Sequence, residues 1–176
     1  LPALRAAHGA IVYFASEDHG KVHLHAVPLS GGKPRVVVKG GSSAAPAVAK
    51  NGTLVFTRQS LQAPAEIFRA RADGTGVTAL THVNDERLKA FDLGRGEDVR
   101  FQGAGGDSVQ MFVVYPPGHE PAKKYPLVQM IHGGPHSSWT DAWSYRWNPL
   151  LFAAPGYVVA CVNFHGSLGS GQKFAD

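Results

Sequence analysis

The sequence predicts two successive β-rich architectures: antiparallel sheet units over residues 1–92 and the beginning of a largely parallel α/β sheet over residues 93–176. Three observations support this prediction. A strand pattern repeats within the first ninety residues, the repeat stops near residue 93, and two nearly continuous apolar runs follow, as is typical of parallel strands covered on both faces. Apolar residues make up 44% of the chain, which is enough for a hydrophobic core.

The first ninety residues contain two copies of one strand pattern, with matching positions 43 residues apart. Each copy has an apolar strand, a polar turn, an alternating strand, a glycine turn and a third strand. A period of 40 to 50 residues built from short strands is typical of β-propeller blades. The sequence therefore predicts the last blades of an antiparallel propeller. The matching positions are 12–14 and 55–57, Leu24 and Ile67, Gly31 and Gly74, and Val37 and Leu80.

The Asn51-Gly52 pair lies between two strands of the second copy. Such a pair supplies the two positive φ angles that a tight hairpin needs. Residues 51–53 also match an N-glycosylation acceptor. The hairpin interpretation is preferred because it also explains the strands on both sides.

The second half begins with a flexible connection at residues 94–97, so we place a domain boundary near residue 93. Two strands are expected at 98–101 and 109–115, followed by two parallel strands at 126–131 and 156–163. Residues 143–154 form the candidate crossover helix. Pro149 would interrupt this helix, and the alternative is that the regular helix begins at Pro149, with proline in its first turn. The expected order is β-β-β-α-β.

The segment His-Gly-Gly-Pro-His, residues 132–136, directly follows the third of these strands. Two glycines allow a sharp turn with an exposed main-chain N–H, and such a donor can stabilise the negative charge that develops on a carbonyl oxygen during acyl transfer. In α/β-hydrolases one oxyanion donor comes from this loop and the other from the residue after the nucleophile. The motif lies between a buried strand and a crossover helix, as this role requires, and it predicts the N-terminal part of an α/β-hydrolase sheet.

Residues 97–176 resemble the start of the catalytic domain in the prolyl oligopeptidase family of serine peptidases, in its acylaminoacyl-peptidase and dipeptidyl-peptidase branch. The resemblance rests on residues 125–128, 132–136, 147–148, 156–159 and 162–171. It implies a propeller over a Ser-Asp-His triad that hydrolyses short peptides at or near their N-terminus. It also implies that Gly134 is the oxyanion-hole donor, with Gly133 as the alternative. This chain departs from many relatives at His165, where they have Arg, and at residues 168–171.

The triad residues are expected beyond Asp176, so the chain is expected to be part of a longer protein and inactive alone. Ser167 is not assigned as the nucleophile, because residues 165–169 lack the first glycine of a Gly-x-Ser-x-Gly elbow and follow no strand that leads into an elbow helix. Two other functions are weighed against the peptidase: a propeller-type binding or scaffold module without catalysis, and a carboxylesterase-like hydrolase.

The remaining histidines, the single cysteine and the tryptophans are interpreted as structural residues. His23 and His25 share a strand face, and His132 and His136 are separated by Gly-Gly-Pro, which cannot hold them on a helix. No motif places a carboxylate or a third ligand beside either pair, so no metal site is expected. Cys161 lies in an apolar run and is interpreted as a small buried hydrophobic residue. The tryptophans at 139, 143 and 147 have a spacing of four, which predicts packing of one helical or near-helical face, and a substrate-facing aromatic is the alternative.

The composition narrows the classes of partner. The net charge of +4 is spread along the chain without a basic run, which argues against nucleic-acid binding. No apolar stretch reaches the roughly 18 residues of a membrane span. No cofactor is expected, and the sequence does not specify a compartment. The expected partners are short peptides, and the strand at 126–131 would be an open apolar edge through which this segment can self-associate.

Overall fold

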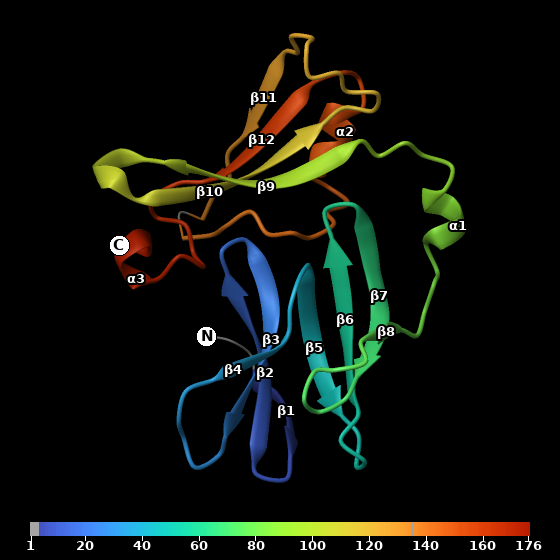
Figure 1. Ribbon diagram of the computed structural model, residues 1–176, viewed down its shortest axis with the longest axis vertical. Helices are drawn as coiled ribbons and strands as arrows, with labels where there is room; N and C mark the ends of the chain where they lie inside the picture. The colour runs from blue at the N-terminus through green and yellow to red at the C-terminus, as the bar shows by residue number, and fades with distance from the viewer. Residues whose placement is uncertain (1–3, 135) are drawn as a thin grey trace.

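The computed structural model describes residues 4–134 and 136–176, and it contains two separate β-sheets. The first sheet is formed by the N-terminal half of the chain, and the second crosses over one end of the first (Figure 1). The strands of the first sheet are β1 (Leu4–His8), β2 (Ile11–Asp18), β3 (Lys21–Pro28), β4 (Arg35–Val38), β5 (Ser42–Val48), β6 (Leu54–Ser60), β7 (Ala63–Ala70) and β8 (Thr78–Ala79).

The strand repeat predicted from the sequence is present in the structure. Strands β1 to β4 and β5 to β8 form two antiparallel meanders of four strands each, and the only pairing between the two meanders in the described residues is parallel, at Val22 and Ser42. Gly31 and Gly74 occupy equivalent turns and have the same φ of 90°. The core between the two meanders includes Tyr13, Leu24 and Phe56.

The two meanders differ in how much of their surface is covered. Leu24 is 0% exposed, whereas Ile67, its equivalent in the second meander, is 41% exposed. Val37 is 9% exposed and its equivalent, Leu80, is 47% exposed. The first meander is covered by the second, and the second exposes the same positions to solvent.

The turn at Asn51-Gly52 joins β5 to β6, as predicted, but only Gly52 has a positive φ, of 82°. The prediction of two positive φ angles was wrong. Asn51 acts instead through its side chain, whose Oδ1 accepts a hydrogen bond from the N–H of Thr53 at 3.1 Å. The loop of this hairpin is one residue longer than a two-residue turn, so a single glycine with a positive φ is enough to reverse the chain.

The second sheet contains β9 (Arg95–Gln102), β10 (Ser108–Tyr115), β11 (Leu127–Met130) and β12 (Val158–Asn163), in the order β11-β12-β10-β9. Strands β11 and β12 are parallel, and β12 is antiparallel to β10. Along the chain, β9, β10 and β11 precede a short helix and β12 follows it, so the predicted order β-β-β-α-β is confirmed. The remaining elements are the short helices α1 (Asp85–Leu88), α2 (Pro149–Ala153), α3 (Gln172–Ala175) and the 3-10 turn η1 (Ala104–Gly106).

The helix expected over residues 143–154 is reduced to α2, which begins at Pro149, as the alternative proposed. Asn148 caps it, because its Oδ1 accepts the N–H of Leu150 at 3.0 Å. Proline is stable at this position because the first helical N–H has no partner within the helix.

Strand β11 forms an edge of the second sheet, and the expectation that it is covered on both faces was wrong for this chain. Leu127 is 64% exposed, and Ile131, which follows the strand, is 70% exposed. Only β12 pairs with β11 among the described residues. An open apolar strand edge is a site at which another strand can pair.

Candidate active-site loop

The glycine pair lies in the loop that leaves the exposed edge strand β11. Gly134 has a φ of 141°, and a Cβ atom built on it would lie 2.9 Å from the main-chain nitrogen of His136. Only glycine fits this turn without displacing main-chain atoms. Gly133 lies beside it on the surface, with open space where a side chain would be. Pro135, the fourth residue of the motif, lies outside the described residues.

His132 anchors the start of this loop to the segment that follows β12. Its ring is stacked on Phe164, with 4.5 Å between the ring centroids and 6° between the planes. Its Nδ1 lies 3.1 Å from the carbonyl oxygen of Gly133 and its Nε2 lies 2.8 Å from the Oγ of Ser167. A carbonyl only accepts, so in the neutral imidazole these contacts place the proton on Nδ1 and the Ser167 hydroxyl donates to Nε2.

Ser167 is fully buried, and its hydroxyl is used in this contact with His132. A serine and a histidine within hydrogen-bond reach can form part of a nucleophilic pair, but such a pair also needs an exposed hydroxyl and an acid that orients the histidine. Here the Nδ1 of His132 faces a carbonyl oxygen rather than a carboxylate. These contacts favour an anchoring role for Ser167.

Trp139 closes the loop at its base. Its indole Nε1 donates to the carbonyl oxygen of Met130 at 3.1 Å, which joins the end of β11 to the end of the loop. The side-chain amide of Asn163 forms two hydrogen bonds with the main chain of Trp139. Its Oδ1 accepts the Trp139 N–H at 2.7 Å, and its Nδ2 donates to the Trp139 carbonyl oxygen at 2.8 Å.

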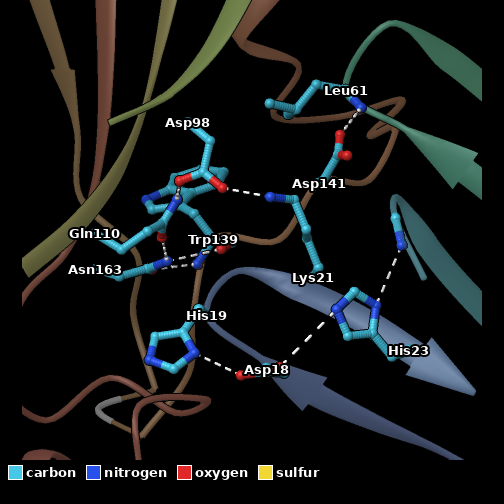
Figure 2. Close-up of polar contacts among 11 residues, drawn as sticks. Asp18, His19, Lys21, His23, Leu61, Asp98, Gln110, Trp139, Asp141 and Asn163 are labelled. Atoms are coloured by element: carbon cyan, nitrogen blue, oxygen red, sulfur yellow. Dashed lines mark hydrogen bonds and ion pairs between the residues drawn. The ribbon is translucent and has the colours of Figure 1, made fainter. Parts of the chain in front are cut away.

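A polar chain extends from Asn163 to the first sheet (Figure 2). The Nδ2 of Asn163 donates to the Oε1 of Gln110 at 2.6 Å, and the Nε2 of Gln110 donates to the Oδ1 of Asp98 at 3.0 Å. The other oxygen of Asp98 is paired with the ammonium of Lys21 at the start of β3. Asn163 and Gln110 are 2% and 1% exposed, so their amides lie within the protein. Residues from both sheets therefore meet behind the loop.

The two sheets also meet at the turn between β2 and β3. The N–H of His19 donates to the carbonyl oxygen of Gly169 at 2.9 Å, and the carbonyl oxygen of Gly20 accepts the N–H of Asp141 at 2.7 Å. The Oδ1 of Asp141 in turn accepts the N–H of Leu61, in the turn between β6 and β7, at 2.8 Å (Figure 2). These contacts place the segment around Asp141 between the two sheets.

His165, one of the positions at which the sequence differs from the pattern expected from the resemblance, contacts Asp107 in the turn between β9 and β10. His165 Nε2 lies 3.0 Å from Asp107 Oδ2, and its ring is stacked on Phe174. The hydrogen bond from His165, followed by the positive charge of Lys173, holds the pKa of Asp107 below its usual range. His165 thus forms an ion pair when it is protonated, the contact that an arginine at this position would make permanently.

A cavity of about 540 Å³ lies beside Gly133, the first residue of the glycine pair. Its walls include Ile131, Gly133, Trp139 and Trp147. Volumes in this range accommodate small ligands, and apolar walls with a few polar groups are typical of binding sites.

The tryptophan stripe is not part of a helix, and the interpretation of one helical face was wrong. Residues 136–148 form no regular helix. Trp139 and Trp143 pack against the core of the second sheet, while Trp147 is 52% exposed and lines the cavity. The spacing of four was misleading because loop contacts, not helical geometry, place each ring.

The remaining candidates have structural contacts. His23 Nδ1 accepts the N–H of Gly40 at 3.3 Å, and burial lowers the pKa of His23. In the described part of the chain, no group of three or more His, Cys, Asp or Glu side chains is arranged to hold a metal ion. Cys161 is fully buried, and burial raises the pKa of its thiol to about 12. Residues 4–134 and 136–176 contain no helix long and apolar enough to cross a membrane.

The sequence pattern did not predict the series of hydrogen bonds that links Asn163 to Lys21. One signal was present in the sequence: Gln110 and Asn163 are amides within or at the end of apolar runs. A buried amide usually needs hydrogen-bond partners. Its partners lie far away in the sequence, so the pattern alone does not name them.

Comparison with known proteins places the chain beside peptidases. It is 35% identical over 173 residues to the probable dipeptidyl-peptidase 5 of Aspergillus clavatus, a match that covers 96% of this chain and 24% of that protein. The structure is similar to Pyrococcus horikoshii acylaminoacyl peptidase, with a TM-score of 0.82, 23% identity and coverage of 99% of this chain and 26% of that one. No protein-family model matches the sequence.

A second structural match is an acylaminoacyl peptidase in complex with Z-Gly-Gly-Phe-chloromethyl ketone. Its TM-score is 0.83, with 23% identity and coverage of 99% of this chain and 27% of that one. The chain spans about a quarter of the length of the relatives that it matches. The comparisons therefore concern one continuous segment of longer proteins.

Proposed function

Because this chain belongs to the prolyl oligopeptidase family, we propose that the protein that contains it is a serine peptidase that hydrolyses short peptides near their N-terminus. The relatives are named for dipeptidyl and acylaminoacyl peptidase activity. One of the similar structures holds a peptide-like chloromethyl ketone. Short peptides are accordingly the proposed substrates.

The proposal includes the finer fold assignment. The two stacked meanders are the last blades of a propeller over residues 1–92, and the second sheet is the N-terminal part of an α/β-hydrolase domain over residues 93–176. The 43-residue repeat and the exposed positions of the second meander support the first assignment, since a blade is covered only where a neighbouring blade packs on it. The parallel pairing of β11 and β12 across α2 supports the second assignment.

The single observation that carries the catalytic proposal is the geometry of Gly134. It follows a strand of the second sheet, turns the chain with a φ of 141°, and lies next to a cavity of about 540 Å³ whose wall includes Gly133. We assign the oxyanion donor to the N–H of Gly134, with the N–H of Gly133 as the alternative. A main-chain donor on a rigid turn stabilises the oxyanion because it needs no reorganisation as charge develops.

The reaction divides between this chain and residues outside it. A serine hydroxyl attacks the peptide carbonyl, and the C–N bond breaks to release the C-terminal part of the peptide as an amine and leave an acyl-enzyme; water then hydrolyses that ester to release the acid and the free serine. The N–H of Gly134 binds the oxygen that becomes negative in both steps. This chain contains no Gly-x-Ser-x-Gly sequence, so the nucleophile is supplied by another segment of the protein.

The test uses a fluorophosphonate probe, which reacts with an activated serine. The full-length protein should be labelled, and residues 1–176 produced alone should not. Labelling of the isolated segment would show that the nucleophile lies within it. A full-length protein that is not labelled and cleaves neither dipeptidyl nor acylaminoacyl substrates would refute the peptidase assignment and favour the scaffold alternative. Cleavage of simple esters but no peptides would favour a carboxylesterase.

The role of the glycine turn is tested by Gly134→Ala in the full-length protein. The new Cβ would lie within 3.0 Å of main-chain atoms of His136, so the turn must move. We expect kcat to fall about 100-fold, as for loss of one oxyanion donor. Gly118→Ala is the matched control, because Gly118 has a positive φ of 64° but nothing within 4 Å of the added atom. An equal loss in both variants would refute the assignment.

A further inference from the structure

The hydrogen bonds behind the loop have only one consistent direction. A carboxylate accepts and does not donate, so Asp98 must receive the Nε2 of Gln110. This leaves the Oε1 of Gln110 as an acceptor, and it receives the Nδ2 of Asn163. The Oδ1 of Asn163 then remains to accept the N–H of Trp139. The charge on Asp98 therefore fixes the orientation of both amides.

The amide of Asn163 matches both polar groups of one residue. It accepts from the N–H and donates to the carbonyl oxygen of Trp139, at 2.7 and 2.8 Å. An amide turned by 180° would place a donor against a donor and an acceptor against an acceptor. Because Asn163 is 2% exposed, water offers little compensation for such a mismatch.

Three anchors of the loop come from the segment 163–168. Asn163 grips Trp139 at the end of the loop, Ser167 holds His132 at its start, and the N–H of Leu168 donates to the carbonyl oxygen of Ser137 at 2.9 Å. The Asn163 anchor differs from the other two in its side-chain connection to the first sheet, which runs through Gln110, Asp98 and Lys21 (Figure 2).

We propose that Asn163 is a positioning residue for the glycine loop, and that the ion pair of Asp98 with Lys21 keeps its amide in the working orientation. The proposal rests on the proposed peptidase function, since the loop carries the oxyanion donor. Asn163 acts through the main chain of Trp139 and does not touch the substrate. In this arrangement the first sheet contributes, through Lys21, to the geometry of the active site.

The test uses Asn163→Asp, Asp98→Asn and the double variant in the full-length protein. In Asn163→Asp an oxygen faces both Gln110 Oε1 and the Trp139 carbonyl oxygen. Gln110 can relieve its contact by turning over, but its Oε1 then faces the Asp98 carboxylate. In the double variant the new amide at position 98 can donate to that oxygen. Asp141→Ala is the control, because it removes a hydrogen bond between the sheets without contacting Asn163.

We expect Asn163→Asp to lower kcat by about 10- to 100-fold with KM changed less than about threefold, since displacement of a catalytic group acts mainly on the transition state. Hydrogen exchange of the peptide 131–139 should accelerate about tenfold, and the double variant should regain about fivefold in kcat. Asp141→Ala should leave kcat and this exchange within about twofold. Asp98→Asn alone should lower kcat by about two- to fivefold.

The proposal is overturned if Asn163→Asp leaves loop exchange and kcat unchanged, or if the double variant loses as much as the sum of the single variants. Should Asn163→Asp fail to fold, Asp98→Asn decides, and unchanged loop exchange and kcat in that variant overturn the proposal. A wild-type protein that cleaves no peptide and reacts with no fluorophosphonate refutes the peptidase function. The hydrogen-exchange comparison still tests the positioning role in that case.

Discussion

The contact between the two sheets depends on the absence of a side chain at position 20. Gly20 has a φ of 72°, and a Cβ atom added to it would lie 2.8 Å from Gln110 Oε1 and 2.9 Å from a ring carbon of Phe112. Gln110 and Phe112 are 1% and 3% exposed. Gln110 cannot retreat without losing its hydrogen bonds to Asn163 and Asp98.

The cost of Gly20→Ala has two parts. The left-handed backbone costs a residue with a Cβ atom about 1–2 kcal/mol. Overpacking against side chains that cannot move adds about 1–3 kcal/mol. The total of about 2–5 kcal/mol is relieved when the turn detaches from the second sheet, so the variant should favour that local opening. Each 1.4 kcal/mol corresponds to a tenfold change in the opening equilibrium.

Native-state hydrogen exchange measures this opening at the N–H groups of Asp141 and His19, which donate across the junction. Both should exchange at least about tenfold faster in Gly20→Ala than in wild type. Gly31→Ala is the control, since Gly31 has a φ of 90° and nothing within 4 Å of the added atom. Exchange at the two amides that is equal in the two variants would show that the junction does not depend on the close approach of Gly20.

Three further predictions concern single groups. Hydrogen bonds from Thr81 and Asn84 lower the pKa of Glu66 to about 2, so the ionised carboxylate stabilises the fold above pH 4.5 and this contribution is lost as the pH falls toward 2. The difference in Tm between wild type and Glu66→Gln should therefore shrink between pH 6 and pH 3. A Tm difference that does not depend on pH would contradict this prediction. Burial raises the pKa of the Cys161 thiol to about 12, so iodoacetamide at pH 8 should modify Cys161 only after unfolding, as detected by mass spectrometry of its peptide, and modification of the native protein would contradict the burial. Residues 1–176 produced alone should self-associate through the open edge at β11, where Leu127 is 64% exposed. Sedimentation velocity should show less association for Leu127→Lys than for the unmodified segment. A monodisperse monomer for the unmodified segment would refute the edge pairing.

Local patterns were enough to predict most of the strands. The 43-residue repeat predicted equivalent strands and the equivalent turns at Gly31 and Gly74, and the order β-β-β-α-β followed from apolar runs and turn residues. These features depend on residues close together in the chain, which is why periodicity detects them. The errors occurred where distant contacts override local preference. Residues 143–148 have a helical spacing of tryptophans, but Trp139 and Trp143 pack against the second sheet and no regular helix forms there.

For the candidate site, the sequence alone singled out the glycine pair, because a His-Gly-Gly turn after an apolar strand is a local signal for a main-chain donor. Only the tertiary structure identified what holds that turn. Asn163, Gln110, Asp98 and Lys21 come from four strands in two sheets, and their amides are oriented by a charge that lies 65 positions away in the chain from Asn163. The direction of these hydrogen bonds depends on which groups are in contact in the folded protein, and a local sequence pattern does not specify contacts between residues far apart in the chain.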